Sequence, residues 1–216
     1  MPNITLYVKD ISKSFNRREV LSNISFSLAQ TQSLTITGKN GSGKSTLLKI
    51  LGGILSASKG RIEIECDEKM LSPLHHHAMI GFVAPYLQLY DEFSAFENLE
   101  IIQQIRGIRS TKTELYALLD RVGLQRRGND LLREYSSGMK QRVKYAVAIA
   151  HRPTILLLDE PSANLDEEGK GMVYELARNQ RSDAVLIIAT NEVDEIGLCE
   201  QVVHLGLETT SSSKRA

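Results

Sequence analysis

Residues 38–45, with the sequence GKNGSGKS, have the composition of a loop that holds phosphate groups. They fit the pattern G-x-x-x-x-G-K-[ST], follow an apolar run at 34–37 and precede a helical pattern that begins at Thr46. The glycines let backbone N–H groups close around phosphate oxygens, and the N-terminus of the following helix adds positive partial charge. Lys44 is expected to bind the β- and γ-phosphates, and the Ser45 hydroxyl to ligate Mg²⁺. We assign phosphate binding to Gly38, Asn40, Gly41, Ser42, Gly43, Lys44, Ser45 and Thr46.

A second run, TILLLDE at 154–160, has the pattern of a buried strand that ends in two carboxylates. Asp159 is expected to ligate Mg²⁺, and Glu160 to polarise an attacking water molecule. Paired acidic residues at the end of a strand are commonly solvated turn residues. The phosphate-binding pattern upstream favours the catalytic interpretation here.

The apolar patterns that must position these residues predict an α/β fold. Continuous apolar runs at 155–158 and 185–189 are typical of parallel strands covered on both faces. Alternating apolar residues near the N-terminus predict an antiparallel β region instead; they are Ile4, Leu6, Val8, Ile24, Phe26 and Leu28.

Helical spacing dominates the middle of the chain, for example at Leu115, Leu118, Leu119 and Val122. We therefore expect a helical subdomain at roughly 86–150, inserted in a single domain that spans 1–208. Residues 209–216 are polar and lack periodicity, which predicts a disordered tail.

Composition excludes several classes of protein. The 216 residues carry 26 basic and 26 acidic side chains, so no overall field favours nucleic acid as a partner. Two distant cysteines and the absence of a signal-peptide pattern indicate a reducing, cytoplasmic location. The apolar runs are far shorter than the roughly 20 residues that cross a bilayer. If the protein serves a membrane process, another chain is expected to span the membrane.

Three consecutive histidines, His75 to His77, raise the possibility of a metal site. On an extended segment, however, neighbouring side chains point alternately and cannot all face one ion. We therefore expect a solvated loop there.

The run YSSGMKQR at 135–142, just upstream of the acidic strand, resembles the signature motif of ABC-transporter ATPases. Ser136 and Gly138 are retained, and family members use these positions to contact the γ-phosphate of ATP. Tyr135, Ser137 and Met139 replace the usual residues. A serine two residues before a glycine is by itself more typical of a helix N-cap. The order of this run relative to the other two motifs strengthens the resemblance, which covers nearly the whole chain.

The resemblance implies a RecA-like P-loop NTPase core that binds ATP and Mg²⁺. Phe15 sits where family members stack an aromatic ring on adenine; the alternative is a Phe in the hydrophobic core, and we favour stacking. The run PSANLD at 161–166 resembles the family's D-loop, in which Asp166 would help two ATP sites to communicate.

The same resemblance implies partners. Two such subunits pack head to tail, as a homodimer or as a heterodimer with another ABC ATPase, and each ATP lies between the phosphate loop of one and the signature motif of the other. The dimer would drive an integral-membrane permease from the cytoplasmic face. The alternative is an ATP-gated regulatory module with little hydrolysis. The loop at 84–87 also resembles the ATPase subunit of haem exporters for cytochrome-c maturation.

Two positions depart from the family pattern. Pro85 stands where the family's glutamine loop has Gln, and proline has no amide side chain to contact a metal or water. Gln88 lies nearby and either substitutes for that glutamine or is a surface residue. Asn191 follows Thr190 where the family has a switch histidine. An asparagine still donates and accepts hydrogen bonds but does not titrate near neutral pH. We therefore predict that Asn191 senses the γ-phosphate and weakens hydrolysis, with Glu160 left to activate water.

Overall fold

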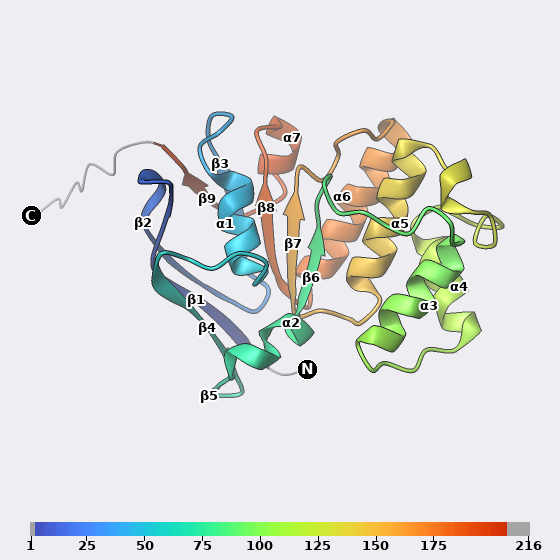
Figure 1. Ribbon diagram of the computed structural model, residues 1–216, viewed down its shortest axis with the longest axis horizontal. Coiled ribbons are helices and arrows are strands. Elements are labelled where there is room, and N and C mark those ends of the chain that lie inside the picture. Colours follow the sequence, from blue (N-terminus) through green and yellow to red (C-terminus); the bar gives the residue numbers. More distant parts are fainter. Residues whose placement is uncertain (1–2, 207–216) are drawn as a thin grey trace, which may run out of the picture.

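The computed structural model describes residues 3–206 of the chain. The tail predicted at 209–216 lies outside the described residues. Figure 1 shows an antiparallel sheet on the left, a parallel sheet in the centre and a group of helices on the right. The predicted α/β class, with an N-terminal antiparallel region and an inserted helical region, is confirmed.

The antiparallel sheet has the strand order β2-β1-β4-β5. Its alternating residues Ile4, Leu6 and Val8 are all buried, as the sequence pattern predicts. The sheet is larger than that pattern indicates, because two strands from beyond the phosphate loop join it. Its strands are β1 (Ile4–Phe15), β2 (Arg18–Ala29), β4 (Lys59–Cys66) and β5 (Lys69–Met70).

The parallel sheet has the strand order β6-β7-β8-β3-β9. Every residue of β3, β7 and β8 is buried, which explains why those runs are apolar throughout. All neighbouring strands in this sheet run in the same direction, so their carboxyl ends share one edge. The strands are β3 (Ser33–Thr37), β6 (Ile80–Val83), β7 (Ile155–Asp159), β8 (Val185–Ala189) and β9 (Gln201–His204).

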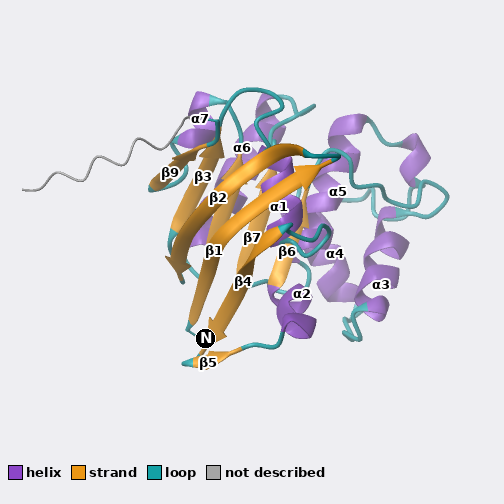
Figure 2. Ribbon diagram, turned by 60° about the vertical axis from the view of Figure 1, so that its left-hand side comes forward, coloured by secondary structure: helices purple, strands orange, loops and turns teal. Residues whose placement is uncertain are grey.

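Helices cover both faces of the parallel sheet. Helix α1 (Lys44–Leu51) lies between the two sheets, as Figure 2 shows, and α6 (Glu167–Arg181) packs on the opposite face. The group on the right of Figure 1 contains α3 (Ala95–Ile105), α4 (Lys112–Arg121) and α5 (Ser137–Ile149). The short elements are η1 (Pro73–His75), α2 (His76–Met79), η2 (Leu132–Glu134) and α7 (Val193–Ile196).

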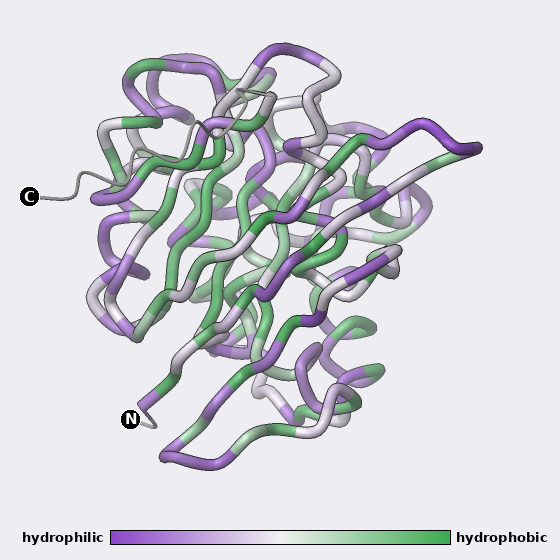
Figure 3. Tube along the Cα trace, turned by 90° about the vertical axis from the view of Figure 1, so that its left-hand side faces the viewer, coloured by the Kyte–Doolittle hydropathy of each residue, from purple (hydrophilic) through white to green (hydrophobic). Residues whose placement is uncertain are grey.

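The core has two parts, one on each face of the parallel sheet. Alternate residues of β7 pack into the two parts of the core. Leu157 faces α1 and the antiparallel sheet, whereas Leu156 and Leu158 face α5 and α6. In Figure 3 the hydrophobic colour is concentrated on the central strands, and hydrophilic segments lie mainly at turns and outer helices. Because both of its faces are buried, the parallel sheet is held in place, and so is the edge of the sheet from which the loops after its strands extend.

The histidine run differs in conformation from its prediction. His75 ends η1 and His76 and His77 begin α2, so the segment is helical rather than extended. His76 Nε2 lies 3.3 Å from the Leu71 carbonyl oxygen. Within residues 3–206, no cluster of three or more His, Cys, Asp or Glu side chains is arranged to hold a metal ion.

Across the described part of the chain, none of the helices combines the length and the apolar character that crossing a membrane requires.

Candidate functional site

The candidate site lies at the carboxyl edge of the parallel sheet. The phosphate loop follows β3, Asp159 ends β7, and Asn191 lies two residues after β8. The loop that contains Pro85 follows β6 on the same edge. In open α/β sheets, this edge is where ligands bind. Residues that are up to 154 positions apart in the sequence therefore meet there, as the bond from Thr37 to Asn191 shows.

Two glycines of the phosphate loop have no tolerance for a side chain. Gly38 has a φ of 148°, and a Cβ there would lie 2.6 Å from the Leu205 carbonyl oxygen and 2.7 Å from Ser42 Oγ. Gly43 has a φ of 100°, and a Cβ there would lie 2.7 Å from Leu21 Cδ2. The close packing explains why this loop requires glycine at both positions.

The other predicted phosphate-binding residues differ in exposure. Asn40 and Gly41 are exposed at the tip of the loop, and Thr46 is half-buried in the first turn of α1. Ser42 is half-buried too, and its Oγ has no hydrogen-bond partner within the described residues. A hydroxyl without a partner in a loop of this shape is available to a phosphate oxygen.

Lys44, Ser45 and Asp159 form the centre of the site. The Lys44 side chain is 7% exposed, and its Nζ donates to the Gly38 carbonyl at 2.7 Å. Ser45 Oγ donates to Asp159 Oδ1 at 3.1 Å. Asp159 is 2% exposed, and burial is the main cause that raises the pKa of its carboxyl group. The phosphate loop and the acidic strand are thus joined as their sequence patterns predict.

This centre fits Mg²⁺. The ion prefers oxygen ligands and is usually held by one or two protein groups together with substrate phosphates and water. A hydroxyl and a buried carboxylate in contact supply such groups. The burial that disfavours the ionised form of Asp159 would be offset by a bound cation.

Glu160 has an unusual backbone conformation. Its φ is 46°, in the left-handed region that glutamate rarely adopts, and its N–H donates to the Ala189 carbonyl at 2.9 Å. The side chain is exposed, whereas the neighbouring Asp159 is buried. Backbone strain of this kind is concentrated at functional sites, where the surrounding structure holds it in place. The strained turn directs the two carboxylates to different environments.

Asn191 is bonded to the phosphate loop. Its Oδ1 accepts from Thr37 Oγ1 at 3.2 Å and from the Gly38 N–H at 3.3 Å. Its Nδ2 donates to Asn40 Oδ1 at 3.3 Å. Asn191 is therefore part of the site and bridges the beginning and the tip of the loop.

Phe15 lies at the end of the β1–β2 hairpin, where it pairs with Arg18. The ring is 44% exposed, and Lys13 Nζ lies 4.9 Å from its centroid. The same hairpin reaches the phosphate loop, because Val20 and Leu21 are the residues that a Cβ on Gly43 would contact. An exposed ring near the loop is suited to stacking on a base.

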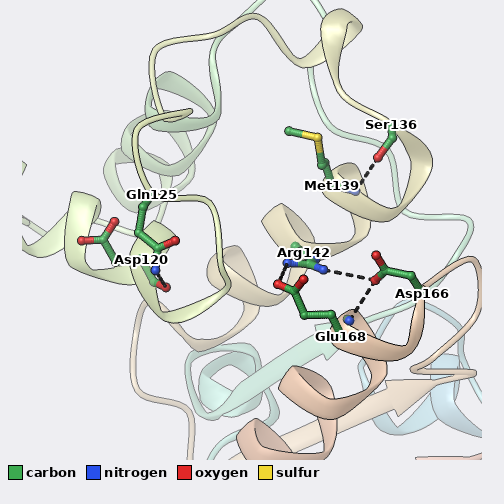
Figure 4. Close-up of polar contacts among 8 residues, drawn as sticks. Asp120, Gln125, Ser136, Met139, Arg142, Asp166 and Glu168 are labelled. Carbon is green, nitrogen blue, oxygen red and sulfur yellow. Dashed lines mark hydrogen bonds and ion pairs between the residues drawn. The ribbon is translucent and has the colours of Figure 1, made fainter.

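The signature residues lie on the helical group, as Figure 4 shows. Ser136 is the N-cap of α5, and its side chain accepts from the Met139 N–H at 3.2 Å. Ser136 is exposed and Gly138 half-buried, with the Asn164 carbonyl 3.2 Å from a Cβ built on Gly138. Within residues 3–206, no hydrogen bond joins Ser136 or Gly138 to the phosphate loop. One chain therefore does not bring these two predicted halves of the site together.

Asp166 has a local structural role. It is the N-cap of α6, and its side chain accepts from the Gly169 N–H at 2.9 Å. Arg142 of α5 bridges this carboxylate at 3.2 Å and that of Glu168 at 3.4 Å, as Figure 4 shows. Backbone and arginine contacts lower the pKa of Asp166. The D-loop residue is thus tied to the signature helix.

Sequence reasoning missed two residues near the site. The carboxyl group of Glu195 is 1% exposed, and its Oε1 accepts from the Ser162 N–H at 2.9 Å. This hydrogen bond holds the beginning of the D-loop in place. The second residue is Tyr86 in the loop after β6, whose ring centroid lies 4.0 Å from Lys49 Nζ of α1. Neither has a local sequence signal, because both contacts depend on segments distant in the sequence.

Comparison with known proteins agrees with this arrangement. The family model described as ABC transporter matches residues 21–163. An uncharacterised ABC transporter ATP-binding protein of Bacillus subtilis (strain 168), YybJ, is 33% identical over 208 residues, which cover 94% of each chain. The chain belongs to the ATP-binding proteins of ABC transporters.

Other members of this ABC family are similarly close. The lipoprotein-releasing system ATP-binding protein LolD of Bacteroides fragilis (strain YCH46) is 33% identical over 210 residues, covering 93% of this chain and 97% of LolD. A solved ATP-binding subunit of an ABC transporter has a TM-score of 0.82 and 26% identity, covering 93% and 85% of the two chains. The dimeric post-hydrolysis structure of the cassette MJ0796 with ADP and Pi shares the fold, with a TM-score of 0.81 and 24% identity over 93% and 94%.

Proposed function

We propose that this ABC protein is the ATP-hydrolysing motor subunit of a transporter, dimerising head to tail on ATP. The observation that carries the proposal is the joined centre of Lys44, Ser45 and Asp159, with Glu160 beside it at the carboxyl edge of the sheet. The family pattern supplies the expectation that ATP is the ligand.

Different residues of the chain carry the separate tasks of phosphate binding, metal binding and water activation. Lys44 and the backbone amides of the phosphate loop bind the β- and γ-phosphates, and Ser45 and Asp159 hold Mg²⁺. The chemistry that Mg²⁺ supplies when bound is neutralisation of charge on those phosphates. Glu160 orients the attacking water and accepts its proton. Asn191 donates a hydrogen bond towards the γ-phosphate from its amide.

The signature residues point to a composite site. Ser136 is exposed on α5 and has no bond to the phosphate loop of its own chain within residues 3–206. In a head-to-tail dimer it contacts the γ-phosphate bound by the partner, together with Gly138. ATP then makes contacts in the closed dimer that the open state lacks, so it favours closure. The partner is a second copy of this chain or another ABC ATPase.

A groove beside the site is suited to an integral-membrane permease at the cytoplasmic face. It lies between the loop after β6 and helices α3 and α5, with a cavity volume of about 300 Å³. The lining combines apolar and basic side chains, among them Ile54, Leu87, Leu89, Ile102, Arg106 and Lys144. Ile54 is 56% exposed, as expected for a residue that a partner covers. The resemblance of this loop to haem exporters stays a prediction about which transporter it serves.

Two observations favour the alternative, an ATP-gated module with little hydrolysis. The Asn191 amide is engaged by Thr37, Gly38 and Asn40, and proline occupies the glutamine position. The presence of Glu160 favours slow but real hydrolysis instead.

Steady-state ATP hydrolysis with Mg²⁺, at high protein concentration, tests the proposal. We expect Glu160→Gln to abolish turnover and retain ATP binding. Glu175→Gln, the same change at an exposed residue of α6, should leave turnover unchanged. Equal inactivity of wild type and Glu160→Gln, with ATP bound by both, would favour the regulatory module and contradict a self-sufficient ATPase.

A further inference from the structure

A separate cavity lies at the edge of the parallel sheet opposite the candidate functional site. It has a volume of about 420 Å³ and is lined by residues of the α3–α4 loop, of α4 and of the connection from α5 to β7. That connection precedes β7, whereas Asp159 is the last residue of β7. In Figure 1 the beginning of β7 is at the bottom, and the phosphate loop after β3 is at the top. A cavity of this size accommodates a small ligand without overlapping the phosphate loop.

Three arginines line this cavity, namely Arg109, Arg121 and Arg152, and all three are exposed. Within residues 3–206, none of their side chains forms an ion pair or a hydrogen bond with another residue. Guanidinium groups bind carboxylate and phosphate oxygens through paired N–H donors. The arginines that form ion pairs lie elsewhere and are Arg61, Arg127, Arg133, Arg142 and Arg181. The three arginines of the cavity therefore have donors available for an anion.

The charges that line the cavity do not balance. Glu114 is the acidic member of the lining, and its Oε2 accepts from the Thr111 N–H at 2.8 Å and from Thr111 Oγ1 at 2.9 Å. His151 also lines the cavity, and burial, followed by the Arg106 charge, lowers its pKa to about 4, so its imidazole is neutral at pH 7. Three positive charges and one negative charge leave an excess of two positive charges. A phosphate monoester carries nearly two negative charges at pH 7 and matches this excess, whereas a single carboxylate does not.

The rest of the cavity wall is apolar. Ile108, Leu118 and Ile149 line it, together with Ala117 and Ala150. Ile108 is 36% exposed and precedes Arg109 in the α3–α4 loop. Small-molecule sites combine an apolar lining with a few polar groups that fix the orientation of the ligand. This wall therefore suits a phosphate ester with an apolar substituent better than it suits inorganic phosphate.

We propose that this cavity binds the phosphate group of an organic phosphate monoester, held by Arg109, Arg121 and Arg152, with the apolar part of the ester against the wall. The same group is present in soluble phosphate esters and in the headgroup of phosphatidic acid. The inference goes beyond the proposed function and does not depend on it, because the cavity and the phosphate loop share no residue.

Titration with phenyl phosphate at pH 8 tests the proposal. We expect saturable binding by wild type, and about tenfold weaker binding by the double variant Arg109→Gln, Arg121→Gln, which loses two charge-assisted contacts. The double variant Arg126→Gln, Arg178→Gln is the matched control, because it removes the same charge at two exposed arginines outside the cavity. Phenyl sulfate, which has one negative charge, should bind wild type several times more weakly than phenyl phosphate. Thermal unfolding checks that each variant folds.

Three outcomes would overturn the proposal. The first is the absence of saturable binding by wild type. The second is an equal loss of affinity in the two double variants, which would indicate a general charge effect. The third is binding that Lys44→Ala abolishes and Arg109→Gln, Arg121→Gln leaves unchanged, which would place phenyl phosphate at the phosphate loop.

Vesicles distinguish the two sources of the phosphate group. Sedimentation with phosphatidylcholine vesicles that contain phosphatidic acid measures binding to the lipid headgroup. Binding that the double variant Arg109→Gln, Arg121→Gln loses and its control retains would support the site with a lipid as its ligand. Binding of phenyl phosphate without binding to vesicles would support the site with a soluble ester as its ligand.

Discussion

The phosphate-loop centre and the two loop ends at Tyr86 and Asn191 differ in what holds them. Lys44 and Asp159 are buried and bonded within the core of the sheet edge. Tyr86 and Asn191 are exposed; the Tyr86 ring lies against Lys49 of α1, and Asn191 is bonded to the phosphate loop. Backbone shape and burial therefore fix the phosphate-loop centre, whereas we propose that side chains on the exposed loops adjust the rate of hydrolysis.

Removing Lys44 should have the largest effect. In Lys44→Ala the charge-assisted bonds to the phosphates are lost, so we expect ATP affinity to fall by about tenfold to a hundredfold. Lys39→Ala is the matched control, because Lys39 is exposed in the same loop. Calorimetric titration measures both. Unchanged affinity in Lys44→Ala would place the nucleotide elsewhere.

A pair of glycine substitutions tests how rigid the buried centre is. Gly38→Ala places a Cβ 2.6 Å from the Leu205 carbonyl oxygen, so we expect a loss of about 2–3 kcal/mol in the free energy of unfolding. Gly41→Ala, with a φ of 80° and no atom within 4 Å of the added Cβ, should lose about 1 kcal/mol. Denaturant unfolding gives both values. Equal losses would mean that packing around Gly38 is not tight.

The variant Asn191→His tests whether the residue at position 191 limits the rate of hydrolysis. Imidazole at this position can bond to both the γ-phosphate and the attacking water, so we expect turnover by the dimer to rise by about threefold to tenfold. Asn191→Gln, which keeps an amide, is the control and should give no gain. Turnover in Asn191→His at or below the wild-type level would contradict the view that this loop end limits hydrolysis.

The smallest effect is expected far from the site, at His151. Burial, followed by the Arg106 charge, lowers the pKa of His151 to about 4, while its bond to the Ile80 carbonyl opposes the shift. The unfolded chain thus binds more protons between about pH 6.5 and 4, and stability falls as pH falls through that window. When the pH falls from 7 to 5, we expect the free energy of unfolding of wild type to fall by about 1 kcal/mol more than that of His151→Gln. Equal losses in thermal unfolding would contradict this assignment.

The same contrast explains what sequence could predict. The phosphate loop and the acidic strand are local patterns, and the structure joins Ser45 to Asp159 as they require. The strand pairing of β4 with β1 is non-local and has no such pattern. Tyr86 was not predicted for the same reason, since its ring lies on Lys49, which comes from another segment. The extended loop predicted for the histidine segment was wrong, because Pro73 begins a helical turn there.

The central claim, a composite ATP site shared by two chains, is tested most directly by mixing two inactive variants. Lys44→Ala disables the phosphate loop. Ser136→Asp keeps an N-cap for α5 but places a negative charge against the partner's γ-phosphate. Ser136→Asn, a neutral N-cap, is the control and should stay active.

We predict that neither inactive variant hydrolyses ATP alone. An equimolar mixture should recover about a quarter of wild-type turnover, because half of randomly formed dimers are mixed and each mixed dimer has one intact site. A mixture that stays inactive, although both variants fold and Ser136→Asp binds ATP, would contradict the composite site.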